Sequence, residues 1–255
     1  MHKITLKTDA EIAIMAEGGK LLAFVRDETV KKIKPGMTTL EIDQIATKLI
    51  KEVGAEPSFS KVPGYHHATC INLNDVVVHG VPNSQTIKNG DLVSLDVGLY
   101  WKKFHSDTSI TVIAGKSTPF QEKFLKAGRD AVDLAIRKAK IGNKIWDLSW
   151  AMQSTVEAAG FSAVTALTGH GIGHNLHEEP AIPCFVAQKA KYTPQIVAGM
   201  VLAIEIMYVA GKSDVVYKND DGWTIATADG KIAGLFEQTV AVTKAGPLIL
   251  TTQNQ

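Results

Sequence analysis

KPGMTTLEIDQIATKLIKEVG, residues 34–54, aligns without a gap with KIGNKIWDLSWAMQSTVEAAG, residues 140–160. The initial lysine, the glycine two residues later and the final glycine coincide in the two stretches. Each stretch is predicted to contain a helix that stops at its last glycine, because glycine readily adopts the backbone conformation that ends a helix. The fold is therefore expected to contain a duplicated helical unit.

Two further features recur in the same order after each helix. His-x-x-Pro occurs as HGVP at 79–82 and HEEP at 177–180, and a β-rich run with an acid six residues after a glycine occurs at 89–101 and 198–210. We expect one domain over residues 1–255 with an internal repeat of approximately 9–113 and 119–245. Because this repeat is far longer than a solenoid unit, a pseudo-two-fold axis should bring its matched elements together at the centre.

Three helix starts share the capping-box pattern, in which a threonine precedes a glutamate or glutamine by three residues. The threonines are Thr8, Thr38 and Thr118, and Pro119 follows the last of them at the first helical position. Helices are predicted at about 8–34, 38–54, 118–140 and 144–160. Together with the β-rich runs, they indicate an α+β protein.

The composition excludes several classes of protein. The chain is 45% apolar and 21% charged, which is typical of a globular domain, and its net charge of +1 favours neither nucleic acid nor membrane. The N-terminal stretch lacks the apolar core of a signal peptide, so Cys70 and Cys184 are expected to be free thiols in a cytoplasmic protein. The apolar run Met200–Ala210 is too short to span a membrane and contains Glu205.

Acidic residues interrupt strands that are otherwise apolar. In the run 91–99, Asp96 lies on the face opposite to a row of valines and leucines, and Asp107 follows beyond a polar turn, as in a hairpin. Glu205 and Glu237 lie in the later runs 200–209 and 234–242. A single acid in such a strand is explained by an edge position or a lysine partner, but four acids facing one centre favour one or two divalent cations.

Histidines gather in TGHGIGHNLHEEP, residues 168–180. The spacing does not fit His-Glu-x-x-His, the alternating glycines disfavour a helix, and no paired cysteines support a zinc finger. A glycine-rich strand or loop that carries histidines into a site built elsewhere is the remaining interpretation. His174 is expected at the surface or next to a ligand rather than as a ligand itself, and His66 and His67 are expected in a loop, where one could line a pocket.

With HGVP, TGHGIG and HEEP in place, the chain resembles the type I methionine aminopeptidases over essentially its whole length. The residues that carry the resemblance are His79, Asp96, Asp107, His170, His177, Glu205 and Glu237. The resemblance implies the α+β pita-bread fold, in which two pseudo-two-fold-related halves surround a central antiparallel sheet with a dinuclear metal site.

The resemblance also implies roles for these residues. It assigns two divalent ions, which could be Co, Mn, Fe(II) or Zn, to Asp96, Asp107, His170, Glu205 and Glu237, with Asp107 and Glu237 bridging the ions. Glu205 would take a proton from the attacking water. His79 and His177 would hydrogen-bond the substrate and the tetrahedral intermediate, and in protonated form would stabilise the developing oxyanion.

The implied activity is removal of the initiator methionine from nascent proteins and peptides, through attack of a metal-activated water on the first peptide bond. The preferred substrates would carry a small second residue. A cytoplasmic monomer is expected, with no nucleic-acid or membrane partner. The ribosome is a partner compatible with this activity, although no residue pattern identifies a docking surface for it.

Phe59, Tyr65, Cys70 and Trp223 are candidates for the substrate methionine pocket. Before the cysteine, the family usually has a Gly-Tyr-x-Gly-Tyr/Phe-Pro segment, whereas this chain reads SFSKVPGYHHATC at 58–70. An ungapped alignment matches Tyr65 and Cys70 but replaces the family's tyrosine and its polar neighbour by Val62 and Pro63. A gapped alignment instead pairs GYH with the family's first tyrosine, and both alignments predict an effect on methionine selectivity.

Three groups of related proteins are alternatives, and prolidases and Xaa-Pro aminopeptidases together form the first. Prolidases and Xaa-Pro aminopeptidases share the fold and ligands but usually carry a sizeable N-terminal domain. Type II methionine aminopeptidases have a helical insertion for which the interval from His177 to Glu205 leaves no room. A non-catalytic pita-bread protein that binds peptides typically loses metal ligands, and all five are present here.

Overall fold

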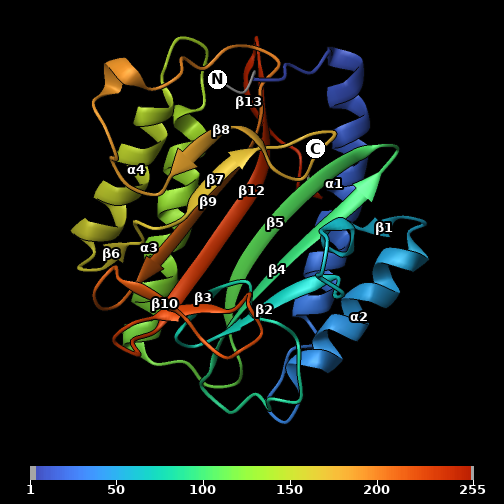
Figure 1. Ribbon diagram of the computed structural model, residues 1–255, viewed down its shortest axis with the longest axis vertical. Coiled ribbons are helices and arrows are strands. Elements are labelled where there is room, and N and C mark those ends of the chain that lie inside the picture. The colour runs from blue at the N-terminus through green and yellow to red at the C-terminus, as the bar shows by residue number, and fades with distance from the viewer. Residues whose placement is uncertain (1–3, 254–255) are drawn as a thin grey trace.

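The computed structural model describes residues 4–253, in which an antiparallel β-sheet is flanked by four α-helices (Figure 1). The helices are α1 (Asp9–Val30), α2 (Thr39–Glu52), α3 (Pro119–Lys138) and α4 (Ile145–Ala158), with short 3-10 helices η1 (Phe59–Lys61) and η2 (Ala190–Tyr192) in loops. The four predicted helices are confirmed. All three predicted capping boxes form, with each threonine side chain accepting from the backbone three residues later.

The first helix ends earlier than predicted, at Val30 instead of near Lys34. After Val30 the chain leaves the helix through tighter bonds, from Lys32 N to Thr29 O and from Ile33 N to Val30 O. The helix cannot continue to Lys34, because a residue that precedes proline is disfavoured in the helical conformation.

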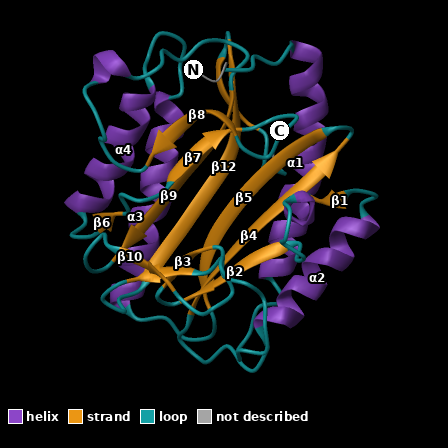
Figure 2. Ribbon diagram, viewed as in Figure 1, coloured by secondary structure: helices purple, strands orange, loops and turns teal. Residues whose placement is uncertain are grey.

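Every strand pairing within the described residues is antiparallel (Figure 2). The main sheet has the order β1-β4-β5-β12-β9-β7-β8. In addition, β2 pairs with β4, β6 pairs with β9, and β13 pairs with β12. A smaller sheet has the order β10-β11-β3. The strands are β1 (Glu56–Pro57), β2 (Thr69–Leu73), β3 (Val76–Val78), β4 (Leu92–Trp101), β5 (Phe104–Ile113), β6 (Ser162–Ala163), β7 (Thr168–Gly171), β8 (Glu178–Pro183), β9 (Val201–Val209), β10 (Val215–Tyr217), β11 (Ile225–Thr227), β12 (Ala233–Thr243) and β13 (Gly246–Ile249).

Alternation along the strands decides which face of the sheet meets the helices. In β4, Val93, Leu95, Val97 and Leu99 belong to one buried cluster with residues of α1 and α2. In β9, Leu202, Ile204 and Ile206 belong to a second cluster with residues of α3 and α4. Burying each such side chain stabilises the fold by roughly 1.5–3 kcal/mol, so a one-residue slip in register would be strongly unfavourable. The residues between them, including Asp96 and Glu205, face away from the helices.

β5 and β12 join the two parts of the sheet. Their register places Glu237 opposite Ser109, and threonine side chains reinforce the strand pairing. Thr108 Oγ1 donates to Glu237 O at 2.9 Å, and Thr239 Oγ1 donates to Asp107 O at 2.8 Å. The joint between β5 and β12 is therefore fixed by side chains as well as by backbone, directly beside Asp107 and Glu237.

The order α1-α2-β4-β5 in the first part of the chain is followed by α3-α4-β9-β12 in the second. In Figure 1, α1 lies beside β4 and β5 with α2 next to it, whereas α3 lies beside β9 and β12 with α4 next to it. This order agrees with the expected repeat of residues 9–113 and 119–245, which stays a prediction.

The sequence also made predictions about its two cysteines and about membrane-spanning helices. Cys70 and Cys184 are buried and free, as expected. Between residues 4 and 253, no helix has the length and apolar character needed to cross a membrane.

Candidate metal centre

Carboxylates from four neighbouring strands meet on the sheet face that is turned away from the helices. Asp96 on β4 is opposite Ser109 on β5, which is opposite Glu237 on β12, which in turn is opposite Glu205 on β9. Asp107 lies two residues before Ser109 and therefore points to the same face. The four acids identified in the sequence thus line one cavity.

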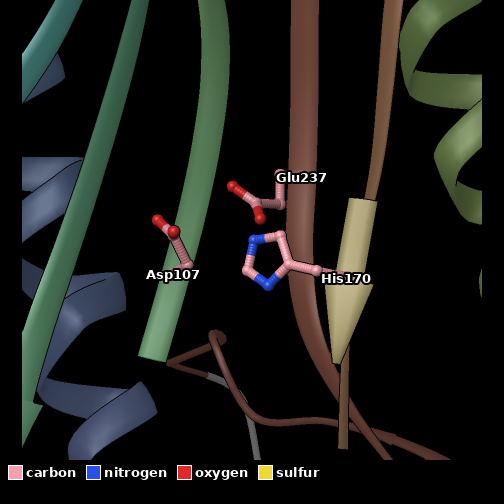
Figure 3. A group of neighbouring side chains, drawn as sticks. All are labelled: Asp107, His170 and Glu237. Atoms are coloured by element: carbon pink, nitrogen blue, oxygen red, sulfur yellow. The ribbon is translucent and has the colours of Figure 1, made fainter. Parts of the chain in front are cut away.

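His170 approaches the acids from β7. It is opposite Ala203, two residues before Glu205, so its side chain shares the face of the carboxylates. Asp107, His170 and Glu237 each offer a ligand atom, and these atoms all lie within 4.8 Å of one another. Figure 3 shows the three side chains on three different strands, with the His170 ring next to the Glu237 carboxylate and Asp107 on β5. The structure brings together all five residues proposed as ligands, although their role as ligands stays a prediction.

The backbone around His170 fixes its orientation and its tautomer. A Cβ atom at Gly169 would lie 2.6 Å from Ala203 O, so only glycine lets β7 approach β9 this closely. His170 Nδ1 lies 2.8 Å from Gly171 O, and a carbonyl can only accept, so Nδ1 carries the proton. The other ring nitrogen is directed to the acids (Figure 3). Burial lowers the pKa of His170 to about 3, which keeps the ring neutral and able to bind a metal.

The four acids have little compensation for their charge. Burial raises the pKa of Asp96 to about 7, and burial together with mutual repulsion raises the pKa of Asp107, Glu205 and Glu237 well above their ordinary values. No ion pair formed within residues 4–253 includes any of them. The Ser109 hydroxyl is 2.7 Å from Asp96 Oδ1 and 3.0 Å from Glu237 Oε2 but has one proton to donate. Four carboxylates and one neutral imidazole therefore fit a divalent cation.

These pKa shifts predict that the metal-free protein loses stability as the pH rises above about 7. A carboxyl group with a raised pKa keeps a proton that the unfolded chain has released, so the free energy of unfolding falls by about 1.4 kcal/mol per pH unit for each such proton. The lowered pKa of His79, His170 and His177 acts in the opposite direction, but only below the ordinary histidine value of 6.5.

Thermal unfolding at pH 7 to 8, in chelator and with added Mn²⁺, measures this effect, since roughly this window lies above the histidine value and below the ordinary thiol pKa. The midpoint in chelator should fall across the window, whereas metal should hold the carboxylates ionised and remove most of the slope. A metal-free midpoint that stays constant or rises would contradict the buried, uncompensated acids.

His79 and His177 line the same cavity as the acids. His79 follows β3 with a left-handed φ of 57°, and His177 precedes β8 with its ring 4.5 Å from the ring of His170, edge to face. Burial lowers the pKa of both, so the protonated form expected from the sequence is disfavoured. A neutral imidazole still donates one N–H to a substrate oxygen.

The cavity has a volume of about 390 Å³ and an apolar wall beside the acids. Phe59, Tyr65, Cys70 and Trp223, the four pocket candidates, all lie in this wall. The Tyr65 hydroxyl donates to Thr69 O at 2.8 Å. The Trp223 ring packs edge-on against the Tyr65 ring, with 5.1 Å between the two ring centroids. The structure thus brings together the aromatic residues that the sequence suggested.

Other wall residues were not predicted as site residues. Val62, Leu176 and Met207 line the cavity, as do residues 166–168. Met207 follows Glu205 by two positions in β9, so strand alternation alone could have identified it. Ser109 was also missed, because only the pairing of β5 with β12 places it between two acids.

The remaining histidines of the sequence analysis lie elsewhere. His174 is exposed, with Nδ1 3.1 Å from Lys103 O, and its ring stacks on Phe104. His67 lies in a loop with Nδ1 3.2 Å from Asp43 Oδ2. The expectations of a surface position for His174 and a loop position for His66 and His67 are confirmed.

A family model described as metallopeptidase family M24 matches residues 13–244. A methionine aminopeptidase of Clostridium perfringens is 42% identical over 248 residues, which span 97% of this chain and 98% of that protein. The crystal structure of methionine aminopeptidase from Thermotoga maritima matches with a TM-score of 0.94 and 36% identity, over 98% of this chain and all of that one.

A prolidase from Pyrococcus furiosus shares the fold with lower structural and sequence similarity. It matches with a TM-score of 0.78 and 24% identity, over 98% of this chain and 66% of that chain. Together with the antiparallel sheet and its helices, these likenesses confirm the pita-bread fold that the sequence implied.

Proposed function

The chain belongs to metallopeptidase family M24, and on this premise we propose that it is a metal-dependent exopeptidase that removes N-terminal methionine from peptides and nascent proteins. The observation that carries the proposal is the cavity that joins an aromatic wall to four carboxylates and three histidines. The wall suits a thioether side chain, because methionine sulfur packs favourably against aromatic rings.

The ligand set proposed for this centre is Asp96, Asp107, His170, Glu205 and Glu237, holding two divalent ions of Co, Mn, Fe(II) or Zn. Five residues with four carboxylates offer more donor atoms than one ion of this kind needs. β4 and β5 from the first half of the chain and β7, β9 and β12 from the second half all contribute. This division supports one catalytic domain over residues 1–255 built from the repeat 9–113 and 119–245.

When bound, such ions lower the pKa of a water molecule and polarise a carbonyl. The protein's own groups would do the rest. Glu205 lines the cavity among the other proposed ligands, where its carboxylate would take a proton from the attacking water. His79 and His177 would donate N–H hydrogen bonds to the substrate carbonyl and to the oxyanion that forms from it.

Several finer points of the proposal concern the cell. The substrates would be nascent polypeptides and peptides with N-terminal methionine followed by a small residue. We propose a monomer acting in the cytoplasm beside the ribosome, without nucleic-acid or membrane partners of its own. The buried free thiols Cys70 and Cys184 support a reducing compartment.

A peptide panel tests the activity and separates it from its relatives. Protein loaded with Co, Mn, Fe(II) or Zn should release methionine from Met-Ala peptides, because the aromatic wall accommodates the side chain of the first residue. It should leave x-Pro peptides intact. Chromatography of the products and metal analysis of the loaded protein provide the measurements.

Chelator-treated protein is the control and should be inactive until metal is restored. Hydrolysis of x-Pro peptides with Met-Ala peptides left intact would favour the prolidase alternative. Binding of less than one ion per chain after loading would exclude the proposed enzyme and favour a non-catalytic peptide-binding protein.

A further inference from the structure

Lys7 is buried although it lies just outside the first helix. Its side chain is 2% exposed, and its Nζ lies 2.5 Å from Glu178 Oε2, whose side chain is 6% exposed. The same ammonium lies 3.3 Å from Thr5 O. A buried ion pair costs desolvation energy on both sides and adds little net stability, so its presence calls for another explanation.

Two glycines shape the slot that holds Lys7. A Cβ atom at Gly173 would lie 2.2 Å from Lys7 Cε, and a Cβ atom at Gly199 would lie 2.8 Å from Lys7 O. Lys7 N also donates to Gly199 O at 2.7 Å. The backbone at Gly173 is thus packed directly against the end of the Lys7 side chain, and a larger residue at position 173 would displace the ammonium group.

Glu178 connects the ion pair to the candidate site. It is the first residue of β8 and follows His177 directly. Its Oε1 accepts from Asn175 N at 3.1 Å, and Gly173 N donates to Asn175 O at 3.1 Å. Glu178 therefore holds the loop of residues 172–177 through one carboxylate oxygen, which accepts from Asn175 N, and binds Lys7 through the other.

The other end of the same loop reaches His170. Glu178 is opposite Gly171 in the pairing of β8 with β7, one residue from His170. Gly173 O accepts from His105 N at 2.8 Å, which fixes the loop to β5. A shift of the loop would consequently move His177 first, whereas His170 is held by its strand.

We propose that Lys7 is a positioning residue, which through its buried ion pair with Glu178 holds the loop 172–177 so that the His177 imidazole stays directed into the cavity. This inference rests on the proposed function for its effect on turnover, but not for its effect on the loop. Loss of the ammonium leaves a buried carboxylate without a charged partner, which draws water into the loop and displaces His177.

The Lys7→Met variant of the full-length, metal-loaded protein tests the effect on turnover. Because a displacement of about 1 Å in a reacting geometry costs about 100-fold in rate, we expect kcat to fall about 100-fold, with KM and bound metal nearly unchanged. The double variant Lys7→Met/Glu178→Gln removes the unpaired charge and keeps an acceptor for Asn175 N. It should recover at least tenfold of the lost kcat, or roughly half of the loss on a logarithmic scale.

A matched control separates positioning from stability. Ile50→Val in α2 removes buried volume from a cluster that contains no residue of 172–178 and should lower the unfolding midpoint without changing kcat. Unchanged kcat in Lys7→Met, or a double variant no more active than Lys7→Met, would overturn the proposal. If Lys7→Met does not fold, the Glu178→Gln variant tests the proposal instead, because its kcat should drop while its metal content stays constant. An unchanged kcat in that variant refutes the positioning role of Lys7.

Hydrogen exchange provides a readout that does not depend on activity. Amide exchange in residues 172–178 should speed up in Lys7→Met, with or without metal, whereas exchange in α3 and α4 should stay as in the unmodified protein. Unchanged protection of the loop would refute the inference even in an active enzyme. An unmodified protein inactive on all Met peptides would refute the proposed function and leave this test of the loop intact.

Discussion

Replacement of Asp107 by asparagine should raise the thermal stability of the metal-free protein and at the same time abolish metal binding and lower peptidase activity by roughly 100-fold or more. The three effects have one cause. Burial and, after it, repulsion from Glu237, Asp96 and Glu205 raise the pKa of Asp107 well above its ordinary value. The charge that makes the site able to hold a cation therefore destabilises the protein without one.

The gain in stability follows from the contacts that asparagine preserves. Asp107 Oδ1 accepts from Thr108 N at 2.9 Å, and an asparagine oxygen can accept the same bond. The new amide nitrogen can donate to a neighbouring carboxylate, which replaces a repulsive contact by a hydrogen bond. We expect the metal-free variant to gain roughly 1–3 kcal/mol at neutral pH, or several degrees in unfolding midpoint.

Scanning calorimetry in chelator, metal analysis after loading and a Met-Ala peptide assay measure the three consequences. Asp130→Asn on the exposed side of α3 is the matched control and should change none of them, because Asp130 pairs with Lys126 at the surface. Metal-dependent activity that survives in Asp107→Asn would contradict the proposed ligand set. A metal-free variant less stable than the unmodified protein would contradict the repulsion argument.

The local features of this fold were readable from the sequence because they depend on neighbours along the chain. Each capping box needs only a threonine and the residue three positions later, and all three formed as predicted. The faces of β4 follow from strict alternation, which left Asp96 opposite the apolar row. The hairpin of β4 and β5 was likewise predicted from two strands joined by a polar turn.

Features that depend on distant pairing were not readable in the same way. Glu205 lies opposite Glu237 because β9 pairs with β12, and Glu237 meets Ser109 because β12 also pairs with β5. No local pattern specifies these registers, so the sequence predicted the acids as a group but not Ser109 between them. The resemblance to a known family, rather than periodicity, supplied the assignment of individual roles.

The ion pair of Lys7 with Glu178 shows the limit most clearly. Lys7 precedes the capping threonine of α1, where a lysine is ordinarily solvated, and Glu178 is one of two adjacent glutamates. Burial of the pair results from a slot shaped by Gly173 and Gly199, which belong to different elements. The glycines indicate in the sequence that another part of the chain packs closely here, but they do not identify Lys7 as the side chain that does so.

Replacement of His79 by alanine should lower kcat by two to four orders of magnitude and leave the metal content unchanged, because donors to the reacting oxygen act on the transition state and not on the ions. His79 lines the cavity with a neutral ring, and its assigned role is to donate one N–H to the substrate. The prediction is opposite to that for Asp107→Asn with respect to metal, so the pair of variants separates residues that hold ions from residues that contact substrate.

The backbone at His79 calls for a second variant. Its φ of 57° is left-handed, and Gly80 N donates to Asn72 Oδ1 at 2.8 Å, which holds this turn in place. Alanine tolerates such a conformation less well than asparagine does, so His79→Asn controls for backbone strain. Both variants should bind metal equally and be equally slow in a peptide assay. Retained turnover in either folded variant would refute the role of His79, whereas loss of metal in both would instead make His79 part of the ion-binding structure.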